Sequence, residues 1–371
     1  MRIDSIEVYL VRMPLIYPFR TSFGDDDTIE SVLVKVSTGD CYGWGEAAPW
    51  EAPAYSPEWA GGVYQVVRRF LAPLIINQDI SSGEELQEKM SRIKGNQFAK
   101  SALDLALWDL LARSRGEPLW KTLGGTRNTV DVGADFGVMD SIEDLLDTVA
   151  GAVEAGFKRV KLKFRPGWEL DMVRAVRERF PDEVFHVDCN SAYTLEYMPM
   201  LTALDSYRLA MIEQPLMHDD LIDHAKLQRE LATPICLDES ITSPEKARKA
   251  IEIKACGWVN IKPGRVGGLT NALRIHDLCQ NAGIPCWVGG MLESSVGAHH
   301  CLALATLPNF LYPNDIFPSE RFYIQDLGTP PVSLSGPSQM SAPGSPGCGA
   351  EPDAGMLQRI CRERAIIRSG R

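Results

Sequence analysis

The chain has 371 residues, of which 45% are hydrophobic and 23% charged, and its formal net charge is −11. Such an acidic chain lacks the basic face that phosphate binding requires, which argues against nucleic acid as a partner. No apolar run approaches the roughly 18 residues that a membrane helix needs, which argues against a membrane span. The length exceeds one average domain and suits a barrel of roughly 200 to 250 residues beside a smaller domain.

The N-terminal stretch MRIDSIEVYLVRMPL carries charges within its apolar run and has no small-residue cleavage site. It therefore predicts a first strand and not a signal peptide. The nine cysteines include no CxxC pair, which is typical of reduced thiols in a protein core. Both features favour a cytoplasmic location.

Residues 1–125 predict an α+β capping domain. RIDSIEVYLVRMPL and ESVLVKVST alternate as strands do, and the apolar spacing becomes helical from Glu58. The segment QFAKSALDLALWDLLARSRG is the clearest helix of the chain, and Gly116 is a suitable stop for it.

Residues 126–325 alternate strictly between short apolar strands and amphipathic helices. Eight strands are predicted, at TVDVGADF, RVKLKF, VFHVDCN, RLAMIEQ, PICLDES, GWVNIKP, IPCWVGG and NFLYPND. Eight β/α units over about 190 residues close into a barrel more readily than they form an open sheet. The predicted fold class is therefore α/β, a (β/α)8 or TIM barrel with an N-terminal capping domain.

Residues 326–371 form a third segment, which we expect to pack back on the capping domain. Its part from 328 to 355 is rich in Pro, Gly and Ser, and this composition predicts an irregular path over the surface. A last short helix is predicted at MLQRICRERA.

Three acids, Asp188, Glu213 and Asp238, each close an apolar run and lie 25 residues apart. This interval is the length of one strand, one helix and two loops, so the acids are expected to meet on one face of the barrel. One such acid would be equally well explained as a helix cap, but the equal spacing of three argues against that. Facing carboxylates need a cation, and the absence of His and Cys favours Mg²⁺ or Mn²⁺ over Zn²⁺. Asn190 and Glu239 follow closely and are expected to orient the ligands.

Lys161 and Lys163 lie two residues apart, so their side chains leave a strand on the same side. On an edge strand such a pair would be solvated, but a barrel strand has no edge, and two buried ammonium groups need a function. Lys262 ends the sixth strand, across the barrel from Lys163. Lysines on opposite faces of a ligand can remove a proton α to a carboxylate and return one. Glu293 is expected to hold a lysine or a loop in place, with a purely structural loop acid as the open alternative.

The motifs KLK, VDCN, IEQP, LDES, NIKPGRVGG and GGMLES, in this order, resemble the enolase superfamily and its muconate-lactonizing subgroup over nearly the whole chain. The resemblance implies Asp188, Glu213 and Asp238 as Mg²⁺ ligands and Lys163 and Lys262 as the acid/base pair. A mandelate racemase would carry a histidine after the seventh strand, where VGGMLE has none. A dipeptide epimerase would carry a D-x-D pair after the eighth, where this chain has PNDIFPSE.

Within the subgroup, PFRTSFG and KFRPGWELD resemble o-succinylbenzoate synthases and the related N-acylamino acid racemases. The implied reaction is the Mg²⁺-dependent syn-dehydration of 2-succinyl-6-hydroxy-2,4-cyclohexadiene-1-carboxylate, a step towards menaquinone. Racemisation of N-acylamino acids and muconate cycloisomerisation remain open. A non-catalytic barrel that binds a metal and a carboxylate is the remote alternative, because it would not need both lysines. A small carboxylate is the expected partner, and the sequence is compatible with a homo-oligomer.

The resemblance also implies that a lid and a loop select the substrate. These positions are Arg20, Ser22, Phe23, Trp50, Tyr55, Ser294 and Ser295.

Overall fold

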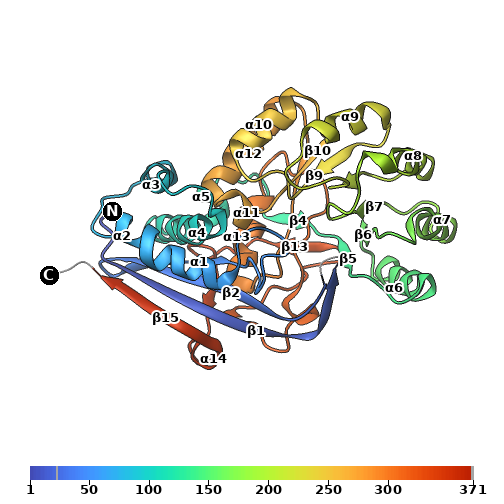
Figure 1. The fold of residues 1–371 in the computed structure, drawn as a ribbon. Coiled ribbons are helices and arrows are strands. Elements are labelled where there is room, and N and C mark those ends of the chain that lie inside the picture. The colour runs from blue at the N-terminus through green and yellow to red at the C-terminus, as the bar shows by residue number, and fades with distance from the viewer. Residues whose placement is uncertain (22–23, 369–371) are drawn as a thin grey trace.

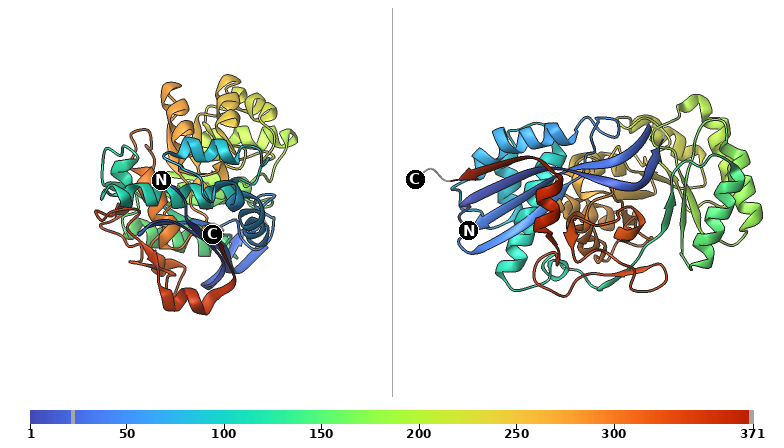
Figure 2. Two further views of the ribbon diagram at one scale, coloured as in Figure 1. Left: turned by 90° about the vertical axis from the view of Figure 1, so that its left-hand side faces the viewer. Right: turned by 90° about the horizontal axis from the view of Figure 1, so that it is seen from below.

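The computed structural model describes residues 1–21 and 24–368, and it contains an antiparallel capping sheet beside a parallel β/α barrel (Figure 1). The capping sheet has the strand order β15-β1-β2-β3, and its neighbouring strands are antiparallel. Its strands are β1 (Ser5–Thr21), β2 (Gly24–Thr38), β3 (Cys41–Ala47) and β15 (Cys361–Arg368). In Figure 2 the long β1–β2 hairpin extends from this sheet towards the barrel.

Helices cover one face of the capping sheet. They are α1 (Ala60–Val66), a π-helical turn (Val67–Leu71), α2 (Ala72–Ile75), α3 (Gly83–Met90), α4 (Gln97–Ser114) and α5 (Leu119–Thr122). The helix α4 is buried on nearly all sides, because it packs on β3 and β2 and also contacts α11 and α12 of the barrel. Gly43 and Gly45 allow this approach, since a Cβ atom on them would lie 2.2 Å from the Ala106 oxygen and 2.3 Å from the Ala102 oxygen.

The barrel sheet has the order β11-β10-β9-β8-β7-β6-β5, and all its strand pairs are parallel. Its strands are β5 (Ala134–Phe136), β6 (Val160–Lys163), β7 (Phe185–Asp188), β8 (Ile212–Glu213), β9 (Ile235–Leu237), β10 (Trp258–Ile261) and β11 (Cys286–Val288). Its helices are α6 (Ile142–Glu154), α7 (Glu169–Arg179), α8 (Met198–Ala203), α9 (Ile222–Glu230), α10 (Pro244–Glu252), α11 (Pro263–Val266), α12 (Leu269–Asn281) and α13 (Ser295–Ala305). Shorter 3₁₀ turns lie at Leu195–Tyr197, Leu204–Tyr207 and Ser319–Arg321. The predicted α/β class is confirmed.

The eighth predicted strand, NFLYPND, is not a regular strand. Single bridges close the barrel there, from Phe310 to Cys286 of β11 and from Asn314 to Val132. The first predicted strand is also divided, into β4 (Thr129–Asp131) and β5, and the break lies at Gly133. The guanidinium of Arg159 packs there, so a Cβ atom on Gly133 would lie 2.1 Å from it.

The C-terminal segment is largely irregular, as predicted, with short strands β12 (Gly328–Thr329), β13 (Gln339–Ser341) and β14 (Glu351–Pro352). The predicted final helix is wrong in its second half. Helix α14 (Ala354–Ile360) ends before Cys361, where β15 begins and pairs with β1. The free edge of β1 supplies backbone partners that outweigh the helical propensity of the segment. The domain limits 1–125, 126–325 and 326–371 stay a prediction.

The described residues form two large hydrophobic cores, one inside the β/α layers and one between the capping sheet and its helices. None of the helices in the described part of the chain has the length and apolar character that crossing a membrane would require. All nine cysteines lie within the described residues and are free thiols.

Candidate active site

Three neighbouring barrel strands carry the acidic trio. Asp188 ends β7 and Glu213 ends β8, and these two residues are paired across the strands. Asp238 directly follows β9, the next strand of the sheet. All three side chains are at most 1% exposed. The equal sequence spacing therefore brings the acids to adjacent strand ends at the mouth of the barrel, as expected for this fold.

Lys163 is the last residue of β6 and lies opposite Asp188 in the strand pairing. Its Nζ donates to Asp188 Oδ2 at 2.8 Å and to Asn190 Oδ1 at 3.0 Å. Asn190 Nδ2 in turn donates to Glu239 Oε1 at 3.1 Å. A chain of hydrogen bonds thus connects Lys163 to Glu239 through Asn190. Burial raises the pKa of Glu239 to about 7.

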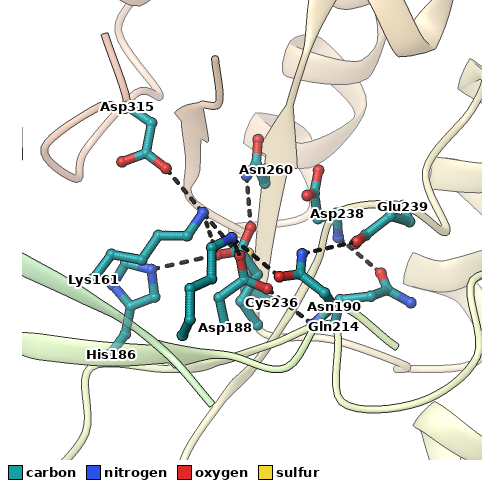
Figure 3. Close-up of polar contacts among 12 residues, drawn as sticks. Lys161, His186, Asp188, Asn190, Gln214, Cys236, Asp238, Glu239, Asn260 and Asp315 are labelled. Atoms are coloured by element: carbon teal, nitrogen blue, oxygen red, sulfur yellow. Dashed lines mark hydrogen bonds and ion pairs between the residues drawn. The ribbon is translucent and has the colours of Figure 1, made fainter. Parts of the chain in front are cut away.

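Lys161 lies deeper on the same strand and contacts three carboxylates (Figure 3). Its Nζ lies 3.0 Å from Asp188 Oδ2, 3.2 Å from Glu213 Oε2 and 3.0 Å from Asp315 Oδ2. Burial opposes the charge of Lys161, but Asp188, Asp315 and Glu213 outweigh this effect and raise its pKa well above the usual value. Lys161 therefore places a buried positive charge beside the trio.

Lys262 approaches the trio from the opposite wall, because β7, β8 and β9 separate β10 from β6 in the sheet. Its Nζ lies 3.0 Å from Asp238 Oδ2 and 4.6 Å from the centre of the Tyr55 ring. Burial lowers the pKa of Lys262, but Tyr55 and Glu239 raise it and the net change is upward. Both lysines predicted to exchange protons thus border the same acidic cluster.

A cavity of about 40 Å³ lies between these lysines. Its lining consists of Phe19, Trp50, Tyr55, Asp135, Lys161, Lys163, Asn190, Lys262, Gly290, Met291, Leu292, Asp315 and Phe317. The capping domain contributes Phe19, Trp50 and Tyr55, and Trp50 Nε1 donates to Met291 O at 3.0 Å. The cavity is too small for a drug-sized ligand, so substrate entry requires the capping residues or the loops to move apart.

The acidic trio offers a donor set that suits a hard divalent cation. Glu213 Oε2 and Asp238 Oδ2 are buried and accept no hydrogen bond, although lysine ammonium groups lie within ion-pair distance of both. A metal ion could be held by a group of three or more Asp, Glu, His or Cys side chains. Among residues 1–21 and 24–368, this conformation contains no such group. The carboxylates contact lysines instead. Oxygen ligands without His or Cys nevertheless fit Mg²⁺, which takes one or a few carboxylates and completes its shell with water and substrate.

Only some of the residues predicted to select the substrate line the cavity. Trp50 and Tyr55 line it. Arg20 forms an exposed ion pair with Asp140, at 2.7 Å, and borders a separate cleft of about 700 Å³. Ser22 and Phe23 lie outside the described residues.

Neither of the two predicted serines of the loop after Glu293 lines the cavity. Ser294 Oγ donates to Glu46 Oε2 at 2.5 Å, and Ser295 N donates to Asp326 Oδ1 at 2.9 Å. Glu293 accepts a hydrogen bond from the backbone N–H of Met291 at 2.8 Å. It therefore holds the loop and, among the described residues, forms no ion pair with a lysine.

Sequence reasoning missed several residues that hold the site. Asp315, in the eighth barrel segment, accepts from Lys161 and from Arg159 Nη2, the latter at 2.7 Å. Asn260 Nδ2 donates to Glu213 Oε1 at 2.8 Å, and Arg265 contacts Asp238 Oδ1 and Tyr55. Asp315 follows the apolar run FLYP after a single asparagine, and this signal could have found it.

Comparisons with known proteins agree with this geometry. The family described as "Enolase C-terminal domain-like" matches residues 144–356, and the "Mandelate racemase / muconate lactonizing enzyme, N-terminal domain" matches residues 5–124. The o-succinylbenzoate synthase of Geobacillus kaustophilus is 44% identical over 96% of each chain. The N-succinylamino acid racemase of Thermus thermophilus is also 44% identical, over 88% of this chain and 89% of its own. A crystal structure of an enolase superfamily member from Listeria innocua superposes with a TM-score of 0.96 at 36% identity, over 99% of each chain.

Proposed function

The chain belongs to the enolase superfamily, in the mandelate racemase and muconate lactonizing enzyme group, and on this premise we propose that it is an o-succinylbenzoate synthase. The common chemistry of this group is the removal of a proton α to a carboxylate. The observation that carries the proposal is the pair formed by Lys163 and Lys262, which border one cavity from opposite walls with buried carboxylates between them.

In the proposed dehydration, Lys163 acts as the base. Its ammonium lies at the cavity surface with 10% of the side chain exposed, and Asn190 and Asp188 orient Nζ. Neutral Lys163 takes the proton from the carbon next to the substrate carboxylate and then returns it to the departing hydroxyl group, which leaves as water. The same lysine serves both steps because a syn-elimination presents the proton and the hydroxyl group on one face.

Lys262 stabilises the negative charge that develops on the substrate carboxylate when the proton leaves. Its contacts with Asp238 and with the Tyr55 ring hold the ammonium at the far wall of the cavity. The raised pKa of Lys262 keeps it cationic, which suits an electrostatic role.

Members of this superfamily typically use Mg²⁺. We propose Asp188, Glu213 and Asp238 as the residues that would hold it, since their oxygens are buried and the donor set contains only carboxylates. Bound there, the cation would neutralise the trio and lower the energy of the enediolate. Asn190 and Glu239 would keep the ligands in place through their hydrogen bond.

Racemisation of N-succinylamino acids is the second candidate, because a relative with that name is as similar to this chain as the synthase is. In this reaction one lysine removes the α proton and the other delivers a proton to the opposite face. Both Lys163 and Lys262 must then exchange protons, whereas the dehydration needs only the charge of Lys262.

The two reactions can be separated with Lys262→Arg, which keeps the charge but cannot act as a base at neutral pH. We expect this variant with Mg²⁺ to retain part of the dehydration of the cyclohexadiene substrate and to lose racemisation of N-succinylamino acids. Solvent deuterium uptake at the α carbon of those amino acids, followed by NMR, measures the second activity directly. Equal losses of dehydration in Lys262→Arg and Lys163→Ala would contradict the one-base mechanism, and no reaction of wild-type enzyme with either substrate would refute the proposed function.

A further inference from the structure

A buried carboxylate of the capping sheet, Glu46, contacts the helix that follows the active-site loop. Glu46 lies in β3 and is 2% exposed. Its Oε2 accepts from Ser294 Oγ at 2.5 Å and from Gly297 N at 3.0 Å, while its Oε1 accepts from Ser294 N at 3.2 Å. Ser31 Oγ, from the neighbouring strand β2, also donates to Oε1, at 2.9 Å. One capping-domain side chain thus accepts hydrogen bonds from two of the backbone N–H groups at the start of α13, those of Ser294 and Gly297.

Glu46 and Glu293 lie so close to the backbone of residue 297 that only glycine fits there. A Cβ atom on Gly297 would lie 3.0 Å from Glu46 Oε2 and 2.7 Å from the Cβ of Glu293. The first turn of α13 therefore lies close to two acids, the buried Glu46 from the capping sheet and the partly buried Glu293 from the loop itself. A residue that served only to fill the core would not need three donors from this helix end.

The loop before α13 forms a wall of the active-site cavity, through Gly290, Met291 and Leu292. Leu292 has φ of 59°, a left-handed conformation that is unfavourable for a branched side chain and persists only where its surroundings hold it. Glu293 holds the Met291 amide, and Trp50 holds the Met291 carbonyl. Glu293 and Trp50 thus hold the middle of the wall at Met291, and Glu46 holds the chain beyond it, where α13 begins.

We propose that Glu46 is a positioning residue of this enzyme, which holds the N-terminal turn of α13 and thereby the Gly290–Leu292 wall against which the substrate is oriented. This inference rests on the proposed function, because it assigns the substrate to that cavity. Glu46 itself touches neither the substrate nor the lysines. Loss of the anchor loosens the wall, which weakens substrate binding more than the chemical step.

The test compares Glu46→Gln with wild type in two measurements. Gln keeps the shape but presents an NH₂ group to at least one of the donors of α13, so one hydrogen bond is lost. We expect amide hydrogen exchange in a peptide covering 289–297 to speed up severalfold in the absence of substrate. With substrate and Mg²⁺, we expect KM to rise about tenfold while kcat per folded enzyme stays within about threefold.

Asp109→Asn is the matched control, because Asp109 is another fully buried carboxylate that accepts backbone N–H groups. It binds Trp44 N at 2.8 Å and Cys348 N at 2.6 Å, away from the cavity. We expect this variant to be destabilised without faster exchange in 289–297 and without a change in KM. A lowered rate per total enzyme at constant KM in Glu46→Gln would indicate only a smaller folded fraction, and it would overturn the positioning role.

Ser294→Ala provides a second variant if Glu46→Gln does not fold. It removes the hydroxyl that donates to Glu46 and that also accepts from Val296 N at 3.3 Å as the N-cap of α13. The same direction of change in exchange and KM is expected, with a smaller size. Unchanged exchange in 289–297 for every folded variant of this pair refutes the inference. If wild-type enzyme is inactive on both substrates, the proposed function fails, and the exchange data still decide whether Glu46 holds the loop.

Discussion

Two groups of buried carboxyl groups in this protein are held in opposite ways. At the barrel mouth, Asp188 contacts the ammonium groups of Lys161 and Lys163, whose charges outweigh its burial and hold its pKa well below the usual value. At the junction between the capping sheet and α13, Glu46 is surrounded by neutral donors, and burial raises its pKa to about 7. Lysine charges compensate the burial of the first group, whereas only neutral hydrogen-bond donors surround the second. The first arrangement is suited to proton transfer and metal binding, and the second to fixing the position of α13.

Replacing the proposed base, Lys163, should cause the largest loss of activity among these variants. Lys163→Ala removes the one lysine, within residues 1–21 and 24–368, that contacts both Asp188 and Asn190. We therefore expect dehydration to fall by about 10³-fold or more with little change in fold. Steady-state rates with Mg²⁺ measure this loss. Lys254→Ala, on the exposed surface, is the control and should retain full activity. A loss below tenfold in Lys163→Ala would mean that another group acts as the base.

Neutralising one member of the trio should weaken metal binding and the fold together. Asp188→Asn leaves Lys161 and Lys163 with less compensating charge in a buried site, and breaking such pairs costs about 3 to 5 kcal/mol of unfolding free energy. We also expect Mg²⁺ affinity, measured by calorimetry, to fall by about 100-fold. Unchanged Mg²⁺ affinity would place the cation elsewhere in the protein.

The Glu46 side of the comparison predicts a pH dependence of stability. A pKa of about 7 in the folded protein, against 4.5 as the ordinary value, means that the folded state binds this proton more tightly than the unfolded state. Its contribution is therefore fully present below pH 4.5 and is lost as the pH rises to about 7, by about 3 kcal/mol in total.

Urea unfolding of wild type and Glu46→Gln at pH 5 and pH 8 isolates this effect, because the other titrating groups cancel in the difference. The nearby groups that respond to the same charge are Glu293, Tyr323 and Cys301. Wild type should lose stability relative to the variant as the pH rises. A difference that does not change with pH would show that Glu46 is not protonated in this range.

The smallest change in KM is expected for Trp50, which also holds the Gly290–Leu292 wall. Trp50→Phe keeps an aromatic ring against the cavity but removes the indole N–H that donates to Met291 O. We expect KM to rise about threefold at nearly constant kcat, since one neutral hydrogen bond contributes about 1 kcal/mol. A KM change larger than that of Glu46→Gln would reverse the ranking of the two anchors.

The barrel mouth was predictable from local sequence because strand geometry repeats. Asp188 and Glu213 close apolar runs at equal intervals, and parallel strands bring such positions to one edge whatever the helices between them contain. The K-x-K pair followed from the two-residue period of a strand in the same way. The irregular closure at Phe310 and the strand that begins at Cys361 were not predictable, because both depend on edges supplied by distant segments.

The sequence by itself determined the α/β class, the acidic trio and the lysines, since each follows from where the strands of a repeating β/α pattern end. Only the tertiary structure decided that Ser294 faces Glu46 and that Asp315 joins Lys161, contacts that span 248 and 154 residues. No local pattern encodes such a pair. Ser294 and Glu46 meet because two separately packed cores dock on each other, whereas Asp315 and Lys161 meet where the 310–315 segment closes the barrel.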